Sequence, residues 1–69
     1  MKKTIFIEGM ACGHCKKAVE KALQDLDGVT SVEVSLQDQK ALVHLEKDIS
    51  NSTLQAVIKD AGYEVIKIQ

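Results

Sequence analysis

The sequence predicts an α+β fold in a single domain, residues 1–69, with a four-stranded antiparallel sheet and two helices on one face of it. Two segments carry apolar residues at helical spacing, and four shorter segments show the alternation or the β-branched content of strands. Along the chain these segments follow the order strand, helix, strand, strand, helix, strand. Because strand–helix–strand connections are right-handed, both helices are expected on the same face, which makes a two-layer sandwich.

The first strand is predicted at residues 4–8, an apolar and partly β-branched run followed by a glycine. A helix then begins at residue 14 or 15 and ends at residue 26. Its apolar side chains recur along one face at helical intervals: Cys15, Ala18, Val19, Ala22, Leu23 and Leu26. Asp27 and Gly28 stop this helix, and Gly28 suits the left-handed conformation that often follows a helix end.

A β-hairpin with one buried face is predicted for residues 32–46, because apolar residues recur at every second position on both sides of a turn at residues 37–39. The inward side chains are Val32, Val34, Leu36, Ala41, Val43 and Leu45. His44 has the outward parity, and we interpret it as part of the sheet surface.

The second helix is capped by Ser50, or by Ser52 with Gln55 three residues on, and Gly62 ends it. Its apolar face consists of Leu54, Val57, Ile58 and Ala61. The last strand covers residues 63–68, with apolar residues on both parities, so its inward face stays open. The complete order, βαββαβ, is that of the ferredoxin-like fold.

The composition argues against several classes of function. Nine lysines against ten acidic residues leave a net charge of −1, and there is no arginine, so we expect no nucleic-acid partner and no membrane partner. The apolar run after Lys3 is too short for a signal peptide or a membrane span, which favours a cytoplasmic location. A chain of 69 residues leaves no room for a substrate cleft, and we expect no enzyme activity.

The chemistry concentrates in residues 9–15, which contain the only two cysteines, Cys12 and Cys15, three apart. In a reducing compartment such a pair indicates metal binding or catalysis. Its place at a helix start brings free N–H groups and partial positive charge, which should lower the pKa of Cys15 and, to a lesser degree, of Cys12.

The number of ligands points to the metal. Structural zinc takes four ligands, whereas this chain offers two thiolates and at best His14. Copper(I), written Cu(I), is soft and accepts two sulfurs in near-linear geometry, so it fits best, with Ag(I) and Hg(II) as chemical mimics. A disulfide across so short a loop would contribute only about 2 kcal/mol, so thiolate coordination is favoured where thiols stay reduced.

Residues 9–15, Gly-Met-Ala-Cys-Gly-His-Cys, resemble the G-M-x-C-x-x-C signature of the heavy-metal-associated domain family. The resemblance covers the whole chain, including residues 27–29 after the first helix and Gly62-Tyr63 before the last strand. It implies Cu(I) binding by Cys12 and Cys15, in free-standing chaperones or in modules of P-type ATPases. The length favours the free-standing form, most like a bacterial copper chaperone. The implied partners are the metal-binding domain of a copper-transporting P-type ATPase and a copper-responsive regulator.

Several neighbouring residues are assigned supporting roles. His14, between the two ligands, should face outward rather than bind metal, and Met10 should anchor the loop in the core. The resemblance gives Tyr63 a role beside the metal, shielding the ion or its thiolates. Lys16, Lys17 and Lys21 form a cationic face on the first helix, which could dock an acidic partner domain.

The sequence leaves other readings of the cysteine pair open. A thiol–disulfide oxidoreductase could use the same dithiol, although the chain has no proline to supply the cis-proline of thioredoxin-like enzymes. A periplasmic mercury-binding homologue is disfavoured, because it would need an export signal. A metal sensor is a further alternative, in which copper changes a partner interface and is never handed on. Four sulfurs from two chains could also share copper in a metal-bridged homodimer.

Overall fold

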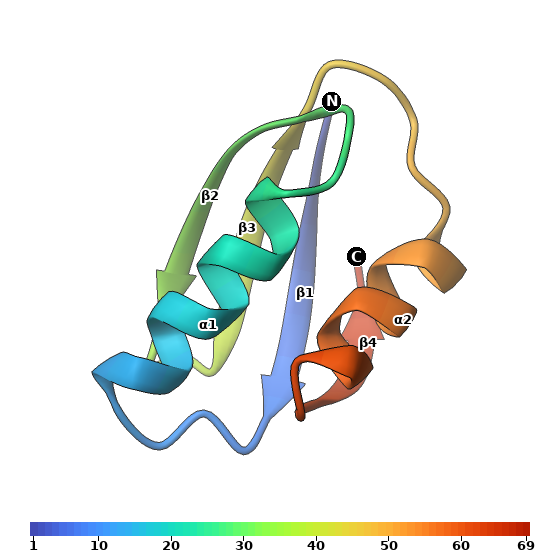
Figure 1. Ribbon diagram of the computed structural model, residues 1–69. Helices are drawn as coiled ribbons and strands as arrows, with labels where there is room; N and C mark the ends of the chain where they lie inside the picture. The colour runs from blue at the N-terminus through green and yellow to red at the C-terminus, as the bar shows by residue number, and fades with distance from the viewer.

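The computed structural model describes residues 1–69 and contains six elements in the predicted order. These are β1 (Lys2–Glu8), α1 (Gly13–Gln24), β2 (Val29–Ser35), β3 (Lys40–Leu45), α2 (Asn51–Asp60) and β4 (Glu64–Ile68). The strands form one antiparallel sheet in the order β2-β3-β1-β4. Both helices cover the same face of it, so the predicted two-layer fold is confirmed (Figure 1). Neither helix combines the length and the apolar character needed to cross a membrane.

An aliphatic core fills the space between the sheet and the helices. The strands contribute their inward residues in alternation, as in Ile5 and Ile7 of β1. The helices contribute Val19 and Leu23 from α1 and Leu54 and Ile58 from α2. The core cluster consists of Ile5, Ile7, Met10, Val19, Leu23, Val32, Val34, Ala41, Val43, Leu45, Ile49, Leu54 and Ile58. Burial of each large side chain is worth about 1.5–3 kcal/mol, which makes this cluster the main source of stability.

Strand β4 contains a bulge, and this bulge determines which side chains of the strand face the core, a point that the sequence left open. Val65 lies opposite Ile7 and Ile68 lies opposite Ile5, although a regular pairing would not place residues three apart on one face. Both side chains are half-buried and pack against the core. Ile66 is the extra residue and is 62% exposed. The inward face of β4 is therefore defined by an irregularity that a period of two does not describe.

The helix ends differ from the predicted ones in ways that have local causes. Helix α1 ends at Gln24, and the N–H of Leu26 bonds to Leu23 O at 3.1 Å, so the chain tightens into a turn before residue 26. Leu26 still packs against the core from this turn, whereas Ala18, predicted on the buried face, is exposed. Gly28 has φ +104°, in the left-handed region, as predicted.

Helix α2 is capped by Ser50, which settles the choice between the two predicted caps. The Ser50 Oγ accepts a hydrogen bond from the N–H of Thr53 at 3.2 Å. Lys3 of β1 strengthens this start, because its Nζ donates to Ile49 O at 2.7 Å and to Asn51 Oδ1 at 2.8 Å. These contacts tie the loop after β3 to the sheet.

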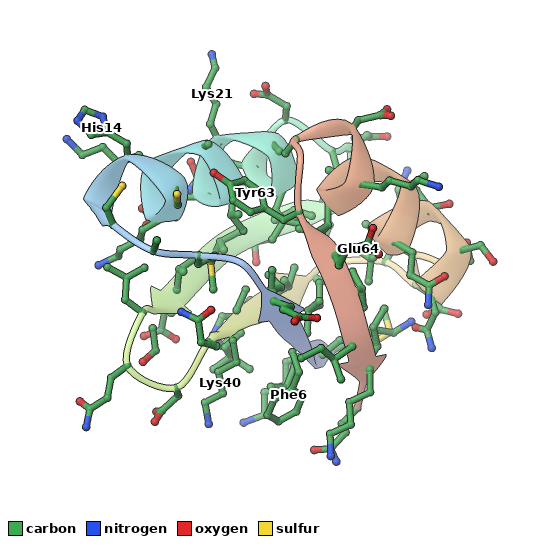
Figure 2. All side chains as sticks on the ribbon, turned by 90° about the horizontal axis from the view of Figure 1, so that it is seen from below. Phe6, His14, Lys21, Lys40, Tyr63 and Glu64 are labelled. Atoms are coloured by element: carbon green, nitrogen blue, oxygen red, sulfur yellow. The ribbon has the colours of Figure 1, made fainter.

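The outer face of the sheet, away from the helices, is covered by no other element. Phe6 lies there with the ammonium groups of Lys67 and Lys40 at 4.8 and 6.0 Å from its ring centre (Figure 2). His44 lies on the same face, with Nε2 3.2 Å from Glu33 Oε2. The surface position predicted for His44 is confirmed.

Candidate metal centre

The cysteine pair lies where the loop after β1 enters α1, at one end of the molecule (Figure 1). Gly9 has φ +98°, a conformation that favours glycine, and it turns the chain out of the central strand β1. Met10 is only 4% exposed, so its side chain fixes this loop in the core. Cys12 is the extended residue before α1, and Cys15 lies in the first turn of the helix. We call residues 9–15 the metal loop.

The two thiols face each other in the metal loop. Cys12 is exposed, Cys15 is half-buried, both are free, and their Sγ atoms lie 3.7 Å apart. This distance is longer than a disulfide bond of about 2.05 Å and shorter than the separation of about 4.5 Å across a linear ion. No group of three or more His, Cys, Asp and Glu side chains occurs in the molecule. The arrangement therefore offers a soft cation two sulfur ligands. It leaves the side of the ion near the exposed Cys12 open.

The thiol of Cys15 is more acidic than that of an ordinary cysteine. Its pKa is lowered from the ordinary 9.0 to about 7, chiefly by hydrogen bonding with the Tyr63 side chain, then by backbone groups of Ala11 and Cys12. The same contact with Cys15, together with partial burial, raises the pKa of Tyr63. The predicted drop in the pKa of Cys15 is confirmed, but Tyr63 is the largest cause, rather than the helix start that the sequence suggested.

Tyr63 comes from the chain just before β4 and reaches toward α1, on the side of the metal loop (Figure 2). Its ring is half-buried, and it passes so close to Gly9 that a Cβ there would lie 3.8 Å from Tyr63 Cδ1. The second half of the fold therefore supplies one wall of the site, beside the half-buried thiol of Cys15.

The other predicted residues lie as follows. His14 is exposed and points away from the body of the molecule, and it forms no three-residue cluster with the cysteines (Figure 2). On α1, Lys17 and Lys21 are exposed and Lys16 is half-buried, and Lys21 projects away from the sheet (Figure 2). These three lysines follow the metal loop along the first half of α1, with Glu20 between Lys17 and Lys21.

One contact of the metal loop is not indicated by the sequence pattern. Gln39, in the turn between β2 and β3, donates from Nε2 to Met10 O at 2.6 Å and to Leu36 O at 2.8 Å. The sequence predicts a turn at residues 37–39, but no local periodicity shows that this turn touches the loop after β1. Gln39 also adopts a left-handed conformation, where glycine or asparagine is more common, but this is seen only in the structure.

Comparison with known proteins agrees with this fold and this motif. Residues 4–64 match the heavy-metal-associated domain, and the chain belongs to that family. The chain is also 46% identical to the copper chaperone CopZ of Staphylococcus aureus (strain bovine RF122 / ET3-1) over 61 residues, which is 87% of this chain and 90% of that protein.

Solved structures show the same architecture. A structure described as CopZ metallochaperone has a TM-score of 0.90 and 40% identity, and the match covers 96% of this chain and 100% of the other. A copper-binding domain from HMA7, a P-type ATPase, has a TM-score of 0.86 and 29% identity, with 100% and 99% of the two chains covered. The similarity therefore extends both to a metallochaperone and to a domain of a P-type ATPase.

Proposed function

We propose that this protein is a copper(I) chaperone that holds the ion between Cys12 and Cys15 and passes it on by ligand exchange. The observation that carries the proposal is the pair of free thiols 3.7 Å apart at an exposed end of the molecule, with no third ligand beside them. The similarity to copper chaperones supports copper as the cargo.

The acid–base state of the site suits capture of a soft cation. With the pKa of Cys15 at about 7, a large fraction of this thiol is thiolate at neutral pH, and the thiolate is the form that binds metal. Cu(I) requires only two soft ligands, whereas zinc would remain short of its usual four. Ag(I) and Hg(II) share this preference and are expected to enter the same site.

The uneven exposure of the two cysteines gives a route for transfer. Cys12 is exposed and Cys15 is half-buried, so a partner's thiolate can approach the ion from the open side near Cys12. A three-coordinate intermediate then forms, the bond to Cys12 breaks first, and Cys15 releases the ion last. Each sulfur that leaves the metal can take up a proton, and the oxidation state of copper does not change.

The proposed partners are proteins that present a similar pair of thiolates. The metal-binding domain of a copper-transporting P-type ATPase is the first candidate, because a domain of that kind shares this fold. A copper-responsive regulator and a second copy of this chain, bridged by copper, are the others. Lys16, Lys17 and Lys21 would receive an acidic partner surface. We propose a cytoplasmic location for this exchange, because a reducing compartment keeps a cysteine pair available to metal.

Native mass spectrometry of the reduced protein tests this function. With Cu(I), Ag(I) or Zn(II) at one equivalent, we expect one tightly bound Cu(I) or Ag(I) and weak binding of zinc. Cys12→Ser and Cys15→Ser should each abolish tight copper binding, whereas His14→Ala, a control within the same loop, should keep it. Tighter binding of zinc than of Cu(I) by the monomer would contradict a two-sulfur site.

The close thiols also support a second candidate, a thiol–disulfide oxidoreductase, because a Sγ separation of 3.7 Å permits closure to a disulfide. One cysteine would attack a substrate disulfide and the other would resolve the mixed disulfide. An insulin-reduction assay separates the two functions. Turnover above that of free dithiothreitol would favour the oxidoreductase, and a rate no higher than that of the reagent would favour the carrier.

A further inference from the structure

Gln39 connects the β2–β3 turn to the metal loop through one half-buried amide group. Both hydrogens of its side-chain NH2 are used, one by Met10 O at 2.6 Å and the other by Leu36 O at 2.8 Å. Because both partners are carbonyl oxygens, only a donor group can occupy this position. The amide thus bridges the metal loop and the turn that faces it.

The backbone of Gln39 is held as firmly as its side chain. Its carbonyl accepts a hydrogen bond from the N–H of Ile7 at 2.9 Å, near the end of β1. Its φ is +53°, and it is the only residue other than glycine with a positive φ in the chain. Glycine would take this conformation without steric cost, so the glutamine at this place is best explained by what its side chain does.

The bridge acts on the start of the metal loop, at the carbonyl of Met10. Met10 is fixed twice, by its buried side chain and by its carbonyl, whereas Cys12, two residues later, is exposed. To hold a linear ion, the sulfurs must separate from 3.7 Å to about 4.5 Å. Since Cys15 belongs to the helix, this movement falls on the segment between Met10 and Cys12.

We propose that Gln39 is a positioning residue of the metal site: its amide holds the Met10 carbonyl, so that Cys12 opens and closes about a fixed point. This inference rests on the proposed function, because it assigns Gln39 a part in copper binding. Gln39 itself does not touch the ion. It limits the conformations that the metal-free loop can adopt, and so reduces the entropy lost when the ion is bound.

Gln39→Glu tests the proposal, because it keeps the size of the side chain and replaces both donors with acceptors. Gln37→Glu is a matched control, since Gln37 is an exposed glutamine of the same turn and gains the same charge. In the metal-free reduced protein, we expect amide hydrogen exchange at residues 11–13 to be about 10-fold faster in Gln39→Glu only. Copper(I) affinity, measured by competition with a chelator, should fall by about 10- to 100-fold.

Gln39→Gly separates positioning from general stability. Glycine relieves the positive φ, which offsets the loss of the two side-chain hydrogen bonds, so the thermal unfolding midpoint should stay about the same, while the loop loses its anchor and copper affinity still falls by about 10-fold. If Gln39 had only a structural role, copper affinity would instead change in step with the thermal unfolding midpoint.

The outcomes separate this inference from the function on which it rests. A wild-type chain that binds no copper(I) contradicts the proposed function itself. A wild-type chain that binds copper(I), with Gln39→Glu and Gln39→Gly keeping their affinity within about twofold, overturns only the role of Gln39.

Discussion

Tyr63 and Cys15 alter each other's acidity across the two halves of the fold. The tyrosine side chain is the largest cause of the drop in the pKa of Cys15 to about 7, and the cysteine in turn is the largest cause of the rise in the pKa of Tyr63. At neutral pH the phenol therefore keeps its proton while the thiol readily loses its own. The donor that stabilises the thiolate comes from the segment before β4, far along the chain from the cysteine motif.

Tyr63→Phe should move the acidity of Cys15 upward. In a Cys12→Ser background, the rate of alkylation by iodoacetamide reports Cys15 alone, and we expect its midpoint near pH 7 with Tyr63 present. With phenylalanine, the midpoint should shift toward the ordinary value of 9.0, because the main hydrogen bond to the thiolate is lost. The rate at pH 7 should fall several-fold, and the rate at high pH should not change. Coincident profiles for the two proteins would contradict this role of Tyr63.

The same shift predicts how stability depends on pH. The folded state lowers the pKa of Cys15, so the thiolate contributes stability that is fully present above about pH 9, the ordinary value, and is lost as the pH falls through 7. Urea unfolding of the reduced, metal-free protein at pH 6, 7, 8 and 9 measures it. Stability should rise across this interval by more in the wild-type protein than in Tyr63→Phe.

Truncation to alanine should change the free energy of unfolding much more in the core than at the bulge of β4. Leu54 is fully buried, and Leu54→Ala should destabilise the protein by about 2–5 kcal/mol, since it removes apolar contacts and leaves a cavity. Ile66 is 62% exposed at the bulge, and Ile66→Ala should change the free energy of unfolding by less than about 0.5 kcal/mol. Urea unfolding measures both values, and equal losses would show that Ile66 packs more closely than described.

Two adjacent lysines provide a test of the link between β1 and α2. The Lys3 ammonium donates to Ile49 O and Asn51 Oδ1, and Lys3→Met should cost about 1–2 kcal/mol by removing both hydrogen bonds. Lys2 is exposed at the same end of β1, so Lys2→Met is a matched control with an expected effect near zero. Chemical unfolding gives the comparison, and indistinguishable variants would mean that the hydrogen bonds of Lys3 contribute nothing measurable.

The lysines of α1 should affect how fast copper is transferred. Reversal of the charge at Lys16, Lys17 or Lys21 should slow transfer to an acidic ATPase metal-binding domain by about 3-fold or more at low salt. The effect should shrink as salt is added, because screening weakens attraction between exposed charges. Lys2→Glu makes the same charge change at the far end of β1 and should leave the rate unaltered. Stopped-flow measurement of transfer distinguishes these cases.

Copper should also promote association of two chains when competing thiols are scarce. The open side of the two-sulfur site can accept sulfurs from a second metal loop, since Cys12 is exposed. Gel filtration with increasing Cu(I) should show a shift to the mass of a dimer, and added glutathione should reverse it. An elution volume that stays monomeric at every copper ratio would exclude the bridged dimer.

The order of the elements could be predicted from the sequence because each helix and strand has a local pattern. The hairpin is the clearest example, since Val32 and Val34 alternate with polar residues and both are buried. The inward face of β4 could not be predicted, because the bulge places Val65 and Ile68 on one side. Ala18 has the spacing of the buried face of α1, yet nothing packs over it and it is exposed.

The proximity of the two thiols could be predicted, because two cysteines three apart at a helix start are a local motif, and their Sγ atoms lie 3.7 Å apart. The environment of the pair depends on contacts between distant segments, and these have no local signature. The effect of Tyr63 on Cys15 requires the end of α2 to lie beside the start of α1, and the bond from Gln39 to Met10 requires the hairpin turn to reach the same end. The resemblance to a known family pointed to Tyr63, whereas Gln39 emerged only from the three-dimensional arrangement.

The two ammonium groups over Phe6 bear on how the protein behaves at high concentration. A flat sheet face with an exposed aromatic ring invites a second molecule to stack on it and start aggregation. Here Lys67 and Lys40 lie over the ring, and a stacking molecule would have to strip water from both charges. Crowding therefore does not readily drive molecules together through this face of the sheet.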